Sequence, residues 1–139
     1  MDHVAIMKKS WNLLDKILSG EKKIESRWYK TRRSPWNRIN IGDNIYFKNS
    51  GEPVNISSKV KKVVQVSDLT YPKIDNILMK YGKDICIDKT WKDKLKGKKY
   101  CILIFLYNVN NTEPFEISKK GFGSMASWIT IDNIERLRI

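Results

Sequence analysis

The fold assignment depends on one stretch, residues 19–38, which read SGEKKIESRWYKTRRSPWNR. Trp28, Tyr29 and Trp36 are interleaved with cations, and Glu25 is the only acid between residues 22 and 38. The seven cations there are Lys22, Lys23, Arg27, Lys30, Arg32, Arg33 and Arg38. Cations neutralise phosphates and flat rings stack on bases, so the combination is typical of a surface that binds nucleic acid. The alternative is a solvated basic loop whose aromatic rings turn into the core.

A spaced motif makes the assignment more specific. Gly20, Lys22, Glu25 and Arg27 follow the pattern G-x-K-x-x-E-x-R, which resembles the signature of ASCH domains, a branch of the PUA-like superfamily. IGDNIYF at residues 41–47 resembles the turn and strand that follow in this family. KGFG at 120–123, followed by ASWI at 126–129, resembles a glycine–aromatic segment of some members. The resemblance therefore extends over nearly the whole chain, residues 8–139.

This resemblance implies a PUA-like β-barrel with flanking helices and a cleft lined by the signature. It also implies an enzymatic alternative, because some small relatives remove the acetyl group from N4-acetylcytidine with a lysine, a threonine and a glutamate. Lys22 matches that lysine, whereas Glu25 stands at the position of the threonine. The third residue has no assigned counterpart, although Asp84 and Asp88 lie in a suitable region. Ribonuclease activity is also associated with the family.

Length and charge narrow the class of protein. A chain of 139 residues is long enough for one domain with a real core, and we expect a single domain over residues 1–139. A hydrophobic content of 41% with 11% aromatic residues indicates a folded protein. The formal charge of +12 favours an anionic partner, with nucleic acid first and an anionic membrane surface second.

Several functions are excluded by what the sequence lacks. The longest apolar run, residues 101–107, is far shorter than the about 20 residues of a membrane helix, so we expect a soluble, cytoplasmic protein without a membrane partner. Cys86 and Cys101 have no zinc-site spacing and are predicted to be buried free thiols. The single histidine, His3, is expected in a frayed terminus, which excludes histidine-based catalysis. We predict neither a metal nor a cofactor.

The order of the expected helices and strands predicts a mixed α+β domain whose strands curl into a small barrel, although periodicity alone does not specify the barrel. The expected elements are a helix over 8–19, strands over 24–29, 44–48 and 54–66, helices over 72–81 and 89–95, strands over 100–109, 114–117 and 128–131, and a helical turn over 132–136. The strand over 54–66 should break near Ser57, and residues 108–112 should turn. The nearly all-apolar strand over 100–109 should be buried and central.

Alternation along residues 24–29 arranges the motif. An extended chain places Lys23, Glu25 and Arg27 on one face and Ile24 on the other. Glu25 and Arg27 would then face the same cleft. This pair either contacts a ligand or is a structural ion pair that supports the strand, and the sequence leaves both interpretations open.

These observations lead to an RNA-binding module as the first hypothesis. Phosphates would meet Arg27, Lys30, Arg32 and Arg33, and an unpaired base would stack on Trp28, Tyr29 or Trp36. The complete predicted binding set is Lys22, Lys23, Glu25, Arg27, Trp28, Tyr29, Lys30, Arg32, Arg33, Trp36, Arg38, Asn49 and Ser50, with Tyr46 as a further neighbour. A second basic cluster over residues 92–99 is interpreted as a solvated surface. The alternatives are a small hydrolase that uses Lys22 and Glu25, and a protein-interaction domain.

Overall fold

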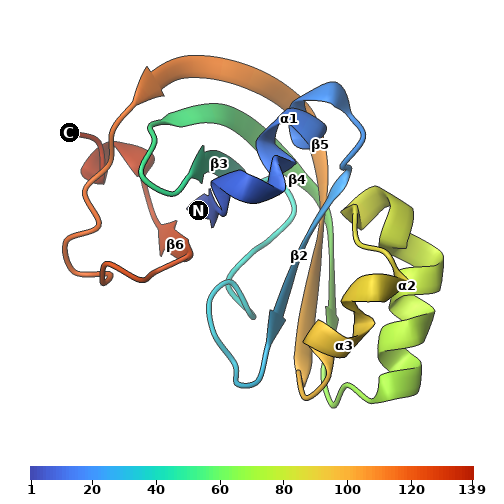
Figure 1. Ribbon diagram of the computed structural model, residues 1–139. Helices are drawn as coiled ribbons and strands as arrows, with labels where there is room; N and C mark the ends of the chain where they lie inside the picture. The colour runs from blue at the N-terminus through green and yellow to red at the C-terminus, as the bar shows by residue number, and fades with distance from the viewer.

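The computed structural model describes residues 1–88 and 90–139 in full. A single mixed sheet of six strands curls into a half-open barrel, and helices lie against it (Figure 1). The strands are β1 (Asp2–Met7), β2 (Ile24–Tyr29), β3 (Asn44–Asn49), β4 (Val54–Val66), β5 (Tyr100–Phe115) and β6 (Trp128–Ile131). Their order in the sheet is β2-β5-β4-β3-β1-β6, so β2 and β6 are its two ends. The predicted α+β class with a curled sheet is confirmed.

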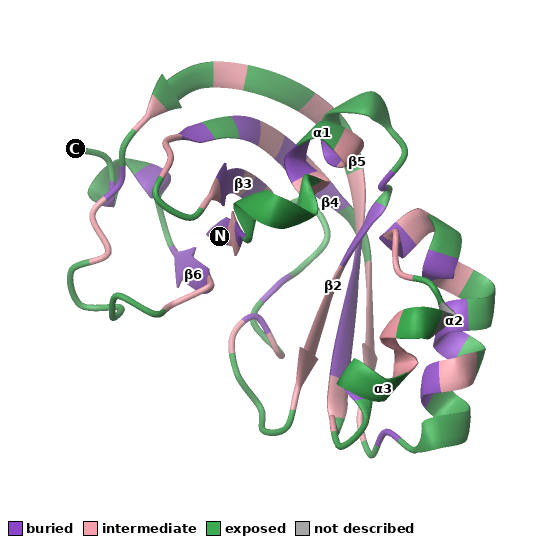
Figure 2. Cartoon of the chain, in the orientation of Figure 1, coloured by how far each residue is buried: buried purple, intermediate pink, exposed green. Residues whose placement is uncertain are grey.

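The remaining regular elements are helical segments that lie against the sheet. They are η1 (Lys9–Trp11), α1 (Leu13–Ser19), α2 (Tyr71–Ile85), η2 (Lys89–Trp91), α3 (Lys92–Leu95) and η3 (Ile134–Arg136). Helix α2 begins after Thr70, whose hydroxyl accepts the Lys73 N–H, and buried residues alternate with exposed ones along it (Figure 2). The predicted end of this helix before Gly82 is wrong. Helix α2 continues through Gly82 to Ile85, and a Cβ at this position would stand 2.8 Å from the Ile87 carbonyl oxygen, so the site favours glycine.

Strand β5 lies between β2 and β4 in the sheet. Its residues 101–104 are fully buried between β2 and β4, which confirms the predicted buried strand. The predicted turn at 108–112 and the separate strand at 114–117 are wrong, because β5 continues to Phe115. Within the polar part of β5, Asn108 adopts a left-handed conformation, and the pairing with β4 shifts register. Such irregularities help a strand to curl. One of these shifts lies between Ser57 and Lys59, where the break in β4 was predicted.

The N-terminal strand β1 was not predicted. It pairs in parallel with β3 and antiparallel with β6, so both partners are remote in sequence and leave no local signal. The expectation that His3 is frayed is wrong, because its side chain is fully buried. His3 Nε2 lies 2.9 Å from Asp43 Oδ2, and the Trp128 indole N–H donates to His3 Nδ1 over 3.2 Å. Thr130 Oγ1 lies 3.0 Å from the same Nδ1.

The predicted first helix is divided in two. Asn12 adopts a left-handed conformation (φ 54°) and separates the 3₁₀ turn η1 from α1. Leu14 and Ile17 are buried, and Gly20 ends α1 in a left-handed conformation (φ 85°). Trp11, which precedes the break, is 44% exposed. The break therefore turns this ring away from the core.

Two apolar cores lie on opposite faces of β2 and β5. One fills the barrel interior around Phe47 and Ile104, and the other lies between the sheet and α2, where Ile24 packs. Glu25 and Arg27 point away from α2, as the alternation predicted. Cys86 and Cys101 are free thiols, and burial raises the pKa of both. Within the described residues, no helix has the length and apolar character needed to cross a membrane.

Candidate functional site

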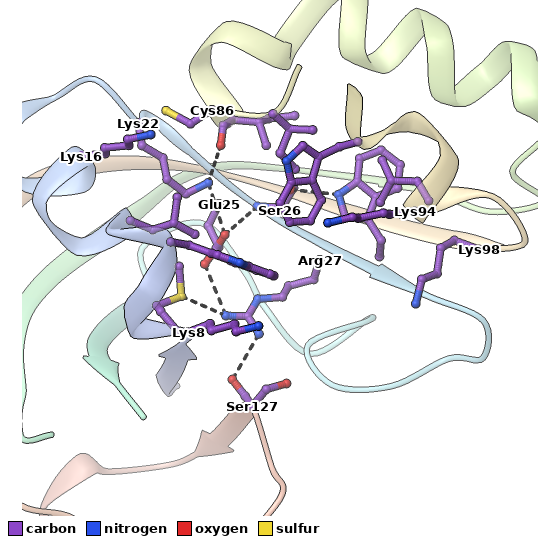
Figure 3. A pocket seen from close by; sticks show the side chains of 18 of the residues that line it. Lys8, Lys16, Lys22, Glu25, Ser26, Arg27, Cys86, Lys94, Lys98 and Ser127 are labelled. Carbon is purple, nitrogen blue, oxygen red and sulfur yellow. Dashed lines mark hydrogen bonds and ion pairs between the residues drawn. The ribbon is translucent and has the colours of Figure 1, made fainter. Parts of the chain in front are cut away.

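A cleft of about 590 Å³ opens beside β2. One wall comes from η1 and α1, and the other comes from the end of α2 together with η2 and α3 (Figures 1 and 3). Its cations are Lys8, Lys16, Lys22, Arg27, Lys94 and Lys98. Among the residues described in full, Glu25 is the only acid that lines it. The cleft therefore has a strongly positive lining assembled from four separate parts of the chain.

Lys22 forms an internal anchor at the inner end of the cleft. Its side chain is 2% exposed, and its Nζ donates to the carbonyl oxygens of Ile24 at 2.9 Å and Ile85 at 2.7 Å. A third acceptor, Glu25 Oε1, lies 3.4 Å away. Three acceptors match the three N–H donors of an ammonium group. Lys22 therefore joins β2 to the end of α2 and has its donors occupied by protein atoms.

Glu25 lies between the two cations of the motif. Its Oε1 accepts the Ser26 N–H at 3.0 Å, and its Oε2 lies 3.3 Å from Arg27 Nη2. The carboxylate is almost completely buried. Buried charges are tolerated when they are paired and hydrogen-bonded, and Glu25 satisfies both conditions. The predicted ion pair between Glu25 and Arg27 is present in the structure.

The motif also covers an open strand edge. The carbonyls of Lys23 and Tyr29 accept hydrogen bonds from the β5 side, so the backbone of the intervening even-numbered residues faces away from β5, toward the cleft. On that edge, the side chain of Lys22 bonds the Ile24 carbonyl and the side chain of Glu25 bonds the Ser26 N–H. Unpaired edge groups invite other strands, and these two side chains occupy part of the edge.

Arg27 spans the opening between the two ends of the sheet. Its guanidinium donates from Nη1 to the Ser127 carbonyl at 3.2 Å and lies over the Trp128 ring, 5.0 Å from the centroid. Met7 Sδ is 3.3 Å from Nη2. Only 12% of the side chain is exposed. Arg27 thus connects β2 to the segment that enters β6 and presents its remaining surface to the cleft.

Aromatic rings line the same cleft. Trp11 and Trp91 come from opposite walls and meet edge to face, with centroids 4.9 Å apart. Lysine ammonium groups lie over both rings, Lys8 over Trp11 and Lys94 over Trp91 at 4.4 Å. Trp28 lines the cleft between these walls. Flat rings and cations are therefore neighbours in space here, as they are in the sequence around residue 28.

The structure brings part of the predicted binding set together. The residues in the cleft are Lys22, Glu25, Arg27, Trp28 and Tyr29. The predicted residues that do not line it are Lys23, Lys30, Arg32, Arg33, Trp36, Arg38, Tyr46, Asn49 and Ser50. Asp84 and Asp88 do not line it either, so they add no acid to the pair of Lys22 and Glu25. A role of the outlying residues in binding stays a prediction.

The basic loop after β2 packs its own rings. Trp36 lies edge-on against Tyr100, with centroids 5.0 Å apart, and Arg32 lies over the same tyrosine. Arg33 lies over Tyr29, and the hydroxyl of Tyr29 donates to the Ser34 carbonyl. Burial raises the pKa of Tyr29 despite the nearby arginines. Trp36 therefore packs against the protein, as the alternative of a solvated basic loop predicted, and does not offer a free stacking surface.

The sequence interpretation missed half of the cleft wall. Lys94 and Lys98 belong to the cluster that was interpreted as solvated, yet both line the cleft, as do Trp11, Lys16 and Trp91. A signal was present, because Trp91 stands among lysines in residues 89–99 just as Trp28 does in residues 22–38. What the sequence could not supply was the packing of η2 and α3 opposite η1.

No protein-family model matches the chain, and no curated protein matches it in sequence. Its structure is nevertheless similar to solved ones. The crystal structure of ASCH from Zymomonas mobilis gives a TM-score of 0.71 at 16% identity, covering 97% of this chain and 90% of that chain. Hypothetical protein PH0355 gives a TM-score of 0.51 at 20% identity, covering 82% of this chain and 99% of that chain. The chain therefore has the ASCH fold, a PUA-like architecture, as the motif at residues 20–27 predicted.

Proposed function

We propose that this protein binds single-stranded nucleic acid, RNA in the first place, in the cleft beside β2. The observation that carries the proposal is the composition of the cleft lining. Six cations and three tryptophans face one hollow, and the single acid among the described lining residues is already paired with two of those cations. Such a lining attracts a polyanion that also has flat rings.

The cations differ in what they contribute. Lys22 and Glu25 neutralise each other locally, so the buried cluster retains the positive charge of Arg27. A guanidinium with a fixed orientation is well suited to a phosphate, because its planar fork matches the oxygens. Lys8, Lys16, Lys94 and Lys98 have no acid opposite them in the cleft, so they add attraction along the backbone of the bound strand.

The size and aromatic lining of the cleft favour an unpaired base. A volume of about 590 Å³ is typical of a pocket that holds one small molecule. In a duplex the base faces are hidden in the stack, whereas an unpaired base can lie against an aromatic ring. Trp28 offers such a ring inside the cleft, and Trp11 and Trp91 offer two more at its walls. We therefore expect single strands to bind more tightly than duplexes.

The contacts of Lys22 favour binding over the hydrolase alternative. A lysine that attacks a substrate needs a free lone pair, whereas the Lys22 Nζ faces three acceptors at 2.7 to 3.4 Å. We expect the wild type to leave N4-acetylcytidine and a short RNA intact. Turnover by the wild type that disappears in Lys22→Arg, with binding kept, would place the protein among enzymes instead.

Fluorescence polarisation with a labelled short single-stranded RNA tests the proposal. If about four to six phosphates are contacted, the logarithm of affinity should fall with the logarithm of salt at a slope of roughly −3 to −4. Arg27→Ala should weaken binding strongly, whereas Lys61→Ala, at an exposed residue outside the cleft, should have little effect. Absence of binding at low salt, or equal effects of the two substitutions, would refute a binding cleft.

A further inference from the structure

A second hollow of about 300 Å³ lies next to the cleft. It is formed where the loop after β2 meets the loop before β6, and its lining includes Arg33, Phe122 and Trp128. None of the described residues that line it is an acid. The glycine–aromatic segment at residues 120–123, which contributed to the family resemblance, provides one side of this hollow.

The hollow and the cleft share a boundary. Tyr29 and Ser127 line both of them. Arg27, on the cleft side, donates to the Ser127 carbonyl at 3.2 Å and lies 5.0 Å from the centroid of Trp128, which lines the hollow. Figure 3 shows Arg27 reaching Ser127 at this edge of the cleft. A strand that leaves the cleft past Arg27 therefore enters the hollow directly.

The second hollow repeats the chemistry of the first on a smaller scale. Phe122 is 41% exposed and offers a ring face, while the Arg33 guanidinium lies 5.5 Å from the Tyr29 ring centroid. The hydroxyl of Tyr29 is held by the Ser34 carbonyl at 3.1 Å, which fixes this ring. One accessible ring beside one cation matches one further nucleotide, which has one base and one phosphate.

We propose, on the basis of the function proposed above, that the hollow binds the nucleotide adjacent to the one in the cleft. Arg27 then contacts the phosphate that links the two nucleotides, because it lies at the boundary. The smallest ligand that fills the site is a dinucleotide of single-stranded nucleic acid. This assigns Arg33 and Phe122 to the second position, apart from the cleft residues that hold the first.

The test measures displacement of a labelled short RNA by 5′-phosphorylated mononucleotides and dinucleotides of uridine and adenosine. The wild type should bind the dinucleotide at least about tenfold more tightly than the mononucleotide, as expected from one extra stacked base. Phe122→Ala should abolish most of this gain and leave mononucleotide affinity unchanged. Tyr107→Ala, which removes an exposed ring outside both hollows, is the matched control.

The outcomes separate the two proposals. Equal affinities for mononucleotide and dinucleotide, or equal losses for both ligands in Phe122→Ala, would overturn the second position while leaving the cleft in place. Failure of the wild type to bind the labelled RNA would refute the nucleic-acid function and the second position together. Arg33→Gln provides an independent check, since it should weaken the dinucleotide more than the mononucleotide, whereas Lys61→Gln should change neither.

Discussion

At the scale of single residues, the buried side chains of Lys22 and Glu25 stabilise the structure around the cleft. Lys22 and Glu25 bond backbone groups of β2 and of the last residue of α2, and Glu25 also pairs with Arg27. A buried ion pair contributes little net stability compared with apolar packing, but breaking it leaves an uncompensated charge. We infer that Lys22 and Glu25 position Arg27 and the strand edge, and that Arg27 is the member which meets the ligand.

The cost of removing Lys22 tests this assignment. Lys22→Met keeps the volume of the stem but leaves the carboxylate of Glu25 with one cation fewer and two carbonyls without a donor. We expect a loss of about 3–5 kcal/mol in the free energy of unfolding, measured by urea denaturation. Lys23→Met, at the exposed neighbouring residue, should change it by less than about 0.5 kcal/mol. Similar losses in the two variants would contradict an anchoring role.

The buried histidine makes stability depend on pH. Burial lowers the pKa of His3 below its ordinary 6.5, although Asp43 and Asp2 act to raise it and the terminal ammonium lowers it further. Below about pH 6.5, His3 is therefore protonated in the unfolded chain but still neutral in the folded chain, so the free energy of unfolding falls as the pH falls. Because only one proton is involved, the free energy of unfolding cannot change by more than about 1.4 kcal/mol per pH unit.

Urea denaturation between about pH 7 and pH 5 measures this dependence. Because the chain has one histidine, His3→Gln should flatten the curve in this interval. At lower pH a further loss is expected from Asp43. Burial acts to raise the pKa of Asp43, but hydrogen bonds from His3, the Asn40 N–H and the terminal ammonium outweigh it and lower that pKa below 3.8. Wild-type stability that stays constant or rises toward pH 5 would contradict the assignment.

At the scale of elements, the sequence predicted what local pattern controls. The apolar run of β5, the alternating β4 and the start of α2 near Pro72 each have a signal within a few residues, and each was predicted. The N-terminal strand was missed because its register depends on β3 and β6, which lie about 40 and 130 residues away. The break at Asn12 was missed because a left-handed asparagine follows the same polar pattern as a helix surface.

Gly82 in α2 gives an element-scale prediction. In an ordinary exposed helix position, Gly→Ala stabilises by about 1 kcal/mol. Here the new Cβ would lie 2.8 Å from the Ile87 carbonyl oxygen, and residues 85–87 form one edge of the cleft. We expect Gly82→Ala to destabilise by about 1–3 kcal/mol, measured by thermal or urea unfolding. Lys83→Ala, one residue later on an exposed face, should be close to neutral, and a stabilising Gly82→Ala would refute the close approach.

At the scale of the whole molecule, the chain has many positive charges, but only a few of them line the cleft. The chain has 27 basic and 15 acidic residues, so composition alone predicted an anionic partner without locating where it binds. The motif located one side of the cleft, because Glu25 and Arg27 lie on β2 and Lys22 lies two residues before it. The walls come from η1 and from η2 with α3. The contact between Trp11 and Trp91 that joins them is a tertiary contact, which no local sequence pattern predicts.

Two triple variants of equal charge separate the cleft from bulk charge. Replacing Lys16, Lys94 and Lys98 by glutamine removes three cleft cations, whereas replacing Lys61, Lys73 and Lys80 removes three exposed cations elsewhere. Each lost phosphate contact lowers the magnitude of the single-strand salt slope by about 0.7, so the cleft variant should lose up to about 2. The surface variant should keep the wild-type slope, because exposed cations far from the strand release no counterions upon binding. Polarisation titrations over the same salt series measure both slopes. If the two variants lose slope equally, the strand is held by the net charge of the molecule and the cleft has no special role.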